Sequence, residues 1–236
     1  MCLRVFKAFG LPTAQADIAT FGKQRVLVVE RFDRVVSSSG NQLFRLMQED
    51  FCQATGTSPF IKYENEGGPG LVSLFTLTQQ SLDAQRDLRT LMASQILFWM
   101  LRAPDGHAKN FSIHLQAGMA GRFRLAPIYD VMSAFPVIGN GPNQWAVQEI
   151  KLAMALLGKN RHYHAHNIGR RHFNSTAKKV GYGENAEPLL EELIARAPTV
   201  VAEVQADLPP GFSQLVADKI LGGLLNAARS LGSSAA

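Results

Sequence analysis

The chain has little cysteine and no long hydrophobic run, and each lack excludes a class of protein. Its 236 residues include only Cys2 and Cys52, whose separation does not match a metal-binding motif. Two such cysteines argue against a disulfide scaffold and suit the reducing cytoplasm. The most apolar stretch, residues 91–101, is too short to cross a bilayer, and the first residues lack the pattern of a signal peptide. We therefore expect a cytoplasmic protein with no membrane contact.

The chain also lacks a strong excess of charge of either sign. Apolar residues make up 46% of it and charged residues 18%, which indicates one large domain or two small lobes around a packed core. The net charge is +5 and the pI is about 9.4. A moderate positive charge permits an anionic partner without requiring one.

Hydrophobic periodicity and turn residues divide the chain into short elements without an internal repeat or a linker. The longest helical signal covers 81–103, with Ser81 as its expected N-cap. The clearest hairpin lies between 111 and 127, where apolar and polar residues alternate. In the irregular loop over 62–70, Gly67, Gly68 and Gly70 around Pro69 predict special backbone angles. The other predictions are a helix over 2–9, a buried strand over 25–34, a short helix over 48–56, two strands near 149–168, and helices over 170–180, 187–206 and 212–231.

A cluster of polar residues stands between the long helix and the hairpin, in the stretch "RAPDGHAKNFSIHL". Asp105 and Asn110 are five residues apart, and Asp130 follows the hairpin. Phosphoryl transfer from ATP needs a carboxylate to orient the attacking hydroxyl and oxygen ligands for Mg²⁺. Kinases space the first carboxylate and a metal-binding Asn as D-x-x-x-x-N. The alternative is that these residues only form turns, which Asp and Asn favour.

Seven blocks of the sequence form a recognisable series along the chain. They are "VVERFDR", "QEDFCQATG", "KYENEGGPG", "DGHAKNFS", "RLAPIYDVMSAFP", "IKLAMAL" and "RRHFNSTAKKVGYG". In this order they resemble the HipA family of bacterial serine/threonine kinases, the toxin halves of type II toxin–antitoxin systems. The resemblance implies an α+β, protein-kinase-like fold, mostly the helical C-lobe with a remnant of the N-lobe. It implies an N-lobe end and hinge over 1–33, a C-lobe over 34–232 and a disordered tail over 233–236.

The same resemblance implies ATP and Mg²⁺ as cofactors and assigns roles to six residues. Asp105 would orient the substrate hydroxyl, and His107 would lie beside the phosphates on the catalytic loop. The remaining four are Asn110 and Asp130, which would hold Mg²⁺, and Glu30 and Phe32, which would meet adenine at the hinge. Without the resemblance, Glu30 and Phe32 read as the end of a strand and His107 as a turn residue. Tyr129 reads as a packing residue, and Lys109 as either a phosphate contact or a solvated lysine.

The implied partners are a helix-turn-helix antitoxin and a protein substrate of the aminoacyl-tRNA synthetase class. Operator DNA is a further possible contact, through the basic residues Arg170, Arg171, Lys178 and Lys179. Solvated surface charge is the alternative for this basic set. His162, His164 and His166 would share one face of a strand, and a solvated strand face is favoured there over a metal site.

One departure from the family pattern bears on activity. A kinase needs a Gly-rich loop over the phosphates and a strand Lys that grips them, and neither precedes "CLRVFKAF" in this sequence. Lys7 lies in a helical stretch, and residues 67–70 follow the hinge. We therefore expect an N-terminally truncated kinase of impaired activity, with a non-catalytic module that docks an antitoxin or DNA as the alternative. A small-molecule kinase is a third hypothesis, which the block order disfavours.

Overall fold

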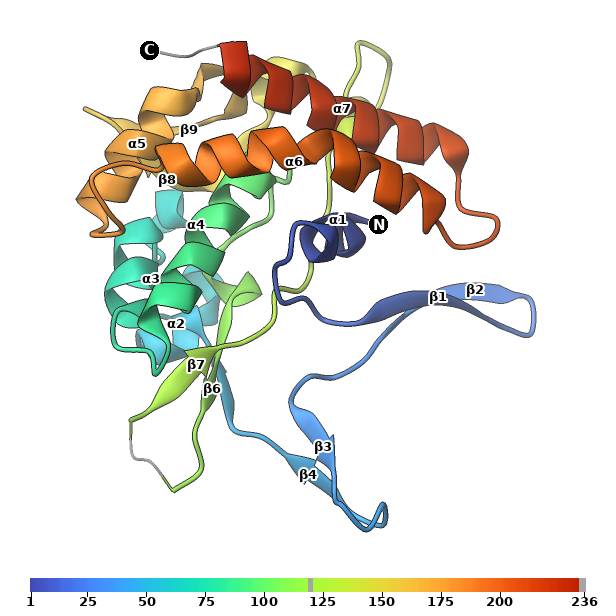
Figure 1. The fold of residues 1–236 in the computed structure, drawn as a ribbon, viewed down its shortest axis with the longest axis vertical. Coiled ribbons are helices and arrows are strands. Elements are labelled where there is room, and N and C mark those ends of the chain that lie inside the picture. Colours follow the sequence, from blue (N-terminus) through green and yellow to red (C-terminus); the bar gives the residue numbers. More distant parts are fainter. Residues whose placement is uncertain (119–120, 234–236) are drawn as a thin grey trace.

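The protein consists of a helical body and short β-hairpins that extend from it (Figure 1). The computed structural model describes residues 1–118 and 121–233. Of the predicted tail, only Ser233 belongs to these residues, and it ends the last helix. The helices are α1 Cys2–Ala8, α2 Phe51–Ala54, α3 Leu71–Thr78, α4 Ala84–Met100, α5 Arg170–Lys179, α6 Glu187–Ala206 and α7 Gln214–Ser233.

Helix α4 is the centre of the body. It packs against α3, α6 and α7, and α6 and α7 lie side by side along one face (Figure 1). Leu91, Ile96 and Leu97 are fully buried, and each such side chain contributes about 1.5–3 kcal/mol through the apolar surface removed from water. Within the described residues, no helix is long and apolar enough to cross a membrane.

The strands form small antiparallel sheets, and one of them carries the predicted site. This three-stranded sheet has the order β5–β6–β7 and contains the predicted hairpin. Each of the other three sheets is a two-stranded hairpin. The strands are β1 Ala16–Phe21, β2 Gln24–Val29, β3 Arg34–Val36, β4 Leu43–Arg45, β5 Gln48–Asp50, β6 Ser112–Leu115, β7 Phe123–Leu125, β8 Lys151–Leu157 and β9 Arg161–His164.

The prediction of a buried strand over 25–34 was wrong about burial. Strand β2 covers the first part of this range, and all six of its residues are exposed, with Leu27 at 68%. The apolar run signalled a strand, but in the described part of the chain β2 pairs only with β1. Its side chains stay exposed, and the hairpin extends away from the body (Figure 1).

Three other predictions needed correction. The range 48–56, expected to be one helix, is divided into strand β5 and helix α2. Asp50 ends the strand and caps the helix: its carboxylate accepts from the backbone N–H of Gln53, and its own N–H donates to the Gln53 side chain. Ser81 does not cap α4, since its hydroxyl donates to Asp87 and accepts from the N–H of Asp83. In the glycine-rich loop only Gly67 has a left-handed backbone, with φ of 97°.

Candidate active site

Asp105 lies on a short loop between α4 and β6. The phenolic O–H of Tyr63 donates to Asp105 Oδ1 over 2.7 Å. The side-chain amide of Asn110 donates to the backbone oxygen of Asp105 over 2.6 Å. This bond closes the loop and leaves the amide oxygen of Asn110 for other contacts. The Asp105 side chain is 32% exposed, so the loop holds its carboxylate in place while keeping it accessible.

His107 is buried beside Asp105. Neither ring nitrogen has a hydrogen bond within the described part of the chain, although Nε2 lies 3.6 Å from Asp105 Oδ1. Burial lowers the pKa of His107, the carboxylates of Asp105 and Asp130 oppose that shift, and Lys62 adds to it. The effect of burial exceeds that of the two carboxylates, so the neutral form of the imidazole is favoured at pH 7.

Asp130 follows β7 on an unusual stretch of backbone. Its φ is 53°, a left-handed value that costs a residue with a side chain about 1–3 kcal/mol. The neighbouring Tyr129 fixes this turn, because its O–H donates to the backbone oxygen of Lys109 over 2.7 Å and pairs with the hydroxyl of Ser112. Tyr129 thus ties the Asp130 turn to the Asn110 loop, and Asp130 itself is exposed.

Asn110 and Asp130 offer hard oxygen ligands of the kind that Mg²⁺ prefers. Among the residues that the structure describes, no three His, Cys, Asp or Glu side chains are grouped to hold a metal ion. Mg²⁺ commonly takes one or two protein ligands and completes its octahedron with water and phosphate oxygens. The donor set of one amide oxygen and one exposed carboxylate fits that mode of binding.

The predicted hinge residues lie beside this site. The backbone N–H of Glu30 donates to the carbonyl of Gln15 over 2.9 Å, and the carbonyl of Glu30 accepts no backbone hydrogen bond from the described residues. The ring of Phe32 packs 5.5 Å from Tyr129 and 5.3 Å from His114. Phe32 therefore joins the hinge segment to the turn that carries Asp130.

Asp33, next to the hinge, was not singled out from the sequence. It is only 3% exposed and accepts hydrogen bonds from the guanidinium groups of Arg31 and Arg34. The hydrogen bond from Arg31 is the largest influence, and together these contacts lower the pKa of Asp33 to about 2. The alternating charges of "ERFDR" could have indicated ion pairs between Asp33 and its neighbouring arginines.

Tyr63 is a site residue that sequence reasoning missed. Besides its hydrogen bond to Asp105, its ring lies edge-on to His107 at 5.0 Å. That hydrogen bond is the main reason why the pKa of Tyr63 is raised to about 12. Tyr63 lies in the "KYENEGGPG" loop, whose glycines predict an irregular backbone but give no signal for the role of the tyrosine.

Glu64 anchors the loop that presents Tyr63. It is buried, and its carboxylate accepts from the N–H of Ala155 in β8 over 2.6 Å. A Cβ at Gly70 would lie 2.3 Å from that carboxylate, and one at Gly68 would lie 2.3 Å from the carbonyl oxygen of Ile61. Glycine is required at both positions because of close contacts and not because of special backbone angles.

Two of the predicted cationic contacts are engaged within the protein. Lys109 pairs with Asp50 over 2.6 Å, so this contact fixes its ammonium against the cap of α2. Arg170, proposed as a DNA or anion contact, is buried and ion-paired with both Glu187 and Glu191. That prediction was wrong for Arg170, because the two carboxylates satisfy its charge.

The rest of the basic set lies on or near the surface of α5. Arg171 is exposed, Lys178 pairs with Glu184 at 3.3 Å, and Lys179 donates to the carbonyl of Gly158. Arg171 and Lys178 are seven residues apart and share a face of the helix, so they are the pair that an anion would meet.

The three alternating histidines do not share one strand face. Strand β9 ends at His164, and His166 lies in the short helical turn that follows. His164 and His166 contact each other with ring centroids 5.6 Å apart, whereas His162 lies 4.2 Å from His172 of α5. The end of the strand therefore separates the set into two pairs.

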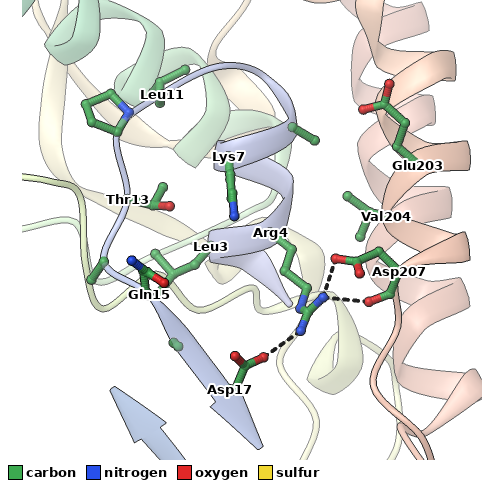
Figure 2. Close-up of a pocket in the computed structure, with 14 residues that line it drawn as sticks. Leu3, Arg4, Lys7, Leu11, Thr13, Gln15, Asp17, Glu203, Val204 and Asp207 are labelled. Carbon is green, nitrogen blue, oxygen red and sulfur yellow. Dashed lines mark hydrogen bonds and ion pairs between the residues drawn. The ribbon is translucent and has the colours of Figure 1, made fainter. Parts of the chain in front are cut away.

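Two large hollows border α1. One, of about 770 Å³, lies between α1, the start of β1 and the end of α6. Figure 2 shows Arg4 spanning it, with ion pairs to Asp17 and Asp207, and it contains none of the predicted site residues. The other, of about 680 Å³, is lined by the apolar β1–β2 hairpin and by Tyr129 and Asp130. The second is therefore the hollow that adjoins the candidate site.

Comparison with known proteins matches the HipA-like C-terminal domain family to residues 1–201. The chain belongs to this family. Among curated proteins, it is 28% identical to the serine/threonine-protein kinase toxin HipA of Shewanella oneidensis over 225 residues, covering 88% of this chain and 48% of that protein. It is 36% identical to the putative kinase Y4mE of Sinorhizobium fredii over 137 residues, covering 57% of this chain and 32% of the relative. This HipA-like chain thus spans a third to a half of the length of these relatives.

Solved structures agree on the fold. The structure of Shewanella oneidensis HipA with HipB and operator DNA superposes with a TM-score of 0.79 at 24% identity, covering 98% of this chain and 55% of the HipA chain. The Helicobacter pylori proinflammatory kinase CtkA superposes with a TM-score of 0.60 at 12% identity, covering 98% of this chain and 81% of the CtkA chain. The HipA-like chain therefore has the predicted α+β, protein-kinase-like fold.

Proposed function

We propose that this HipA-like domain belongs to a serine/threonine protein kinase that transfers the γ-phosphate of ATP to a protein hydroxyl. The observation that carries the proposal is the Asp105 loop, in which Asn110 is bonded to the Asp105 backbone and the Asp105 carboxylate lies 3.6 Å from the buried His107. Tyr129 ties the turn that carries Asp130 to this loop through the backbone oxygen of Lys109. Asp105 would orient the acceptor hydroxyl, since Tyr63 occupies only one of its oxygens. Asn110 and Asp130 would hold Mg²⁺, which neutralises phosphate charge during transfer.

The nucleotide would occupy the hollow of about 680 Å³ beside Asp130. Leu27 and Val29 supply apolar surface there for a flat base. The open carbonyl of Glu30 and the ring of Phe32 lie at the hinge. These features support ATP as the cofactor, with its phosphates directed toward Asp130.

Phosphotransfer by these 236 residues alone is expected to be weak. A phosphate-covering glycine loop and a strand lysine are each worth several kcal/mol of transition-state stabilisation in kinases. The sequence has neither ahead of α1. The loop and the lysine also hold the phosphates of the bound nucleotide. An excess of Mg-ATP is therefore expected to leave the melting temperature of this chain unmoved, whereas a ligand at about 100 times its Kd adds about 2.7 kcal/mol to the stability.

The proposed partners follow from the family. The Shewanella oneidensis HipA structure contains HipB and operator DNA, which supports a helix-turn-helix antitoxin as partner here. The exposed pair Arg171 and Lys178 is the proposed DNA-facing surface. An aminoacyl-tRNA synthetase is the proposed acceptor class, which would set the reaction in the cytoplasm. The alternative is a docking module without catalysis, favoured by the exposed apolar β1–β2 hairpin.

The test is transfer of radiolabel from [γ-³²P]ATP to protein serine or threonine. The enzyme would be this chain joined at residue 1 to the preceding half of the Shewanella oneidensis toxin. We expect Asp105→Asn to abolish labelling while leaving the melting temperature within 2–3 °C, since about 1 kcal/mol corresponds to that shift in a domain of this size. Lys159→Gln, an exposed change away from the site, serves as the matched control. Undiminished labelling by the Asp105→Asn protein would refute the proposal.

A further inference from the structure

A small hollow lies between the Tyr63 loop and the strands β8 and β9. It has a volume of about 210 Å³, room for one side chain, and it has both aromatic and basic walls. Pro104, directly before Asp105, lines it, and so does Tyr63, whose O–H donates to Asp105. The hollow is therefore one residue away from the carboxylate that would orient an acceptor hydroxyl. Its other walls include Lys151, Leu152, Tyr163 and His164.

An irregularity between β8 and β9 accounts for the hollow. Lys151 pairs with His164, but the next pair is Leu156 with His162. Four residues of β8 thus stand opposite Tyr163 alone, so the two strands separate between these pairs. Bulges of this kind occur frequently beside active sites, where they redirect side chains.

The residues that line the hollow carry no negative charge. No carboxylate is among them, and Lys151 is exposed without an ion pair in the described part of the chain. Nδ1 of His164 hydrogen-bonds to the carbonyl of Gln148 at 3.1 Å, which leaves Nε2 for another contact. Two acids adjoin the lining and already have partners: Asp105 accepts from Tyr63, and Glu64 accepts from the N–H of Ala155. A carboxylate entering the hollow would therefore find Lys151 as its unpaired cationic partner.

We propose that this hollow is the subsite for an acidic side chain next to the phosphoacceptor residue, so that the preferred substrate is a serine or threonine flanked by Glu or Asp. As a kinase subsite it rests on the proposed function. Lys151 pairs with the carboxylate, Tyr63 and Tyr163 flank its methylene groups, and the acceptor hydroxyl then reaches Asp105. Complementary charge of this kind sets specificity more than affinity.

The test uses the chain itself and does not depend on phosphate transfer. The probes are three peptides, Gly-Gly-X-Ser-X-Gly-Gly with X as Glu, Gln or Lys, and binding is followed by amide chemical shifts in ¹H–¹⁵N NMR spectra. We expect the Glu peptide to bind about threefold to fivefold more tightly than the Gln peptide, as for one partly exposed ion pair. The Lys peptide should bind most weakly. Lys151→Gln should remove these differences.

Lys159→Gln is the matched control, because it makes the same charge change in the turn between β8 and β9 without touching the hollow. It should leave the preference for the Glu peptide intact. Equal affinities for the three peptides, binding of none, or a preference that survives Lys151→Gln would each overturn the proposal. Failure of labelling in the ATP assay combined with a Lys151-dependent preference would instead refute the kinase function and leave an acidic-peptide site.

Discussion

The contact between Gly70 and Glu64 provides a stringent test of how the site is built. In Gly70→Ala the new Cβ would lie 2.3 Å from the Glu64 carboxylate, so that carboxylate must leave the N–H of Ala155. The Gly70 backbone, at φ −107° and ψ −171°, suits alanine, so the clash is the main cost. Losing a hydrogen bond to a charged acceptor costs about 1.5–3 kcal/mol, and burying an unpaired N–H adds to this. We expect a loss of about 3 kcal/mol.

Urea unfolding followed by circular dichroism measures this loss, and a double-mutant cycle isolates its cause. Glu64→Ala removes the same hydrogen bond and should cost about the same. In that background Gly70→Ala should cost at most about 1 kcal/mol, the ordinary preference for glycine over alanine at a helix N-cap. Additive effects, or a Gly70→Ala protein as stable as the wild type, would refute the reasoning.

Three further predictions concern single side chains around the site. Tyr63→Phe removes the donor to Asp105, and in the ATP assay on the joined protein it should lower the labelling rate about tenfold, with the KM for ATP unchanged. Asp33→Asn should cost about 1–2 kcal/mol at pH 7. Because the pKa of Asp33 falls from 3.8 to about 2 on folding, this difference should be present above pH 4 and vanish as the pH falls to about 2 in urea titrations. Burial lowers the pKa of His107, so the unfolded chain takes up its proton more readily. Stability should be full above about pH 6.5 and fall below it, and His107→Gln should flatten that part of the pH profile.

The sequence was informative where chemistry and periodicity coincide. The hairpin after "DGHAKN" was predicted from alternation and is confirmed as β6 and β7. The helices of the last third were predicted within two residues at each end. The order of helix, loop, hairpin and Asp130 indicated a phosphotransfer site because each carboxylate follows a rigid element.

Contacts between distant segments were not predictable from one sequence. The role of Tyr63 depends on a loop 42 residues before Asp105, and local pattern carries no signal for that approach. The state of Arg170 depends on two acids in the next helix, so its charge looked available when it was not. Exposure of β2 depends on what lies against the strand, which an apolar run does not report.

The most direct test of the central claim is a titration of the chain with Mn²⁺, observed on the side-chain amide of Asn110 by ¹H–¹⁵N NMR. Mn²⁺ takes the oxygen ligands of Mg²⁺, and its unpaired electrons broaden signals of nearby nuclei even when binding is weak. If Asn110 and Asp130 hold a divalent cation together, the Asn110 signals should disappear early in the titration. They should persist in Asp130→Asn and disappear as in the wild type in Lys159→Gln. Broadening that is equal in the wild type and Asp130→Asn, or that spares Asn110, would contradict the account.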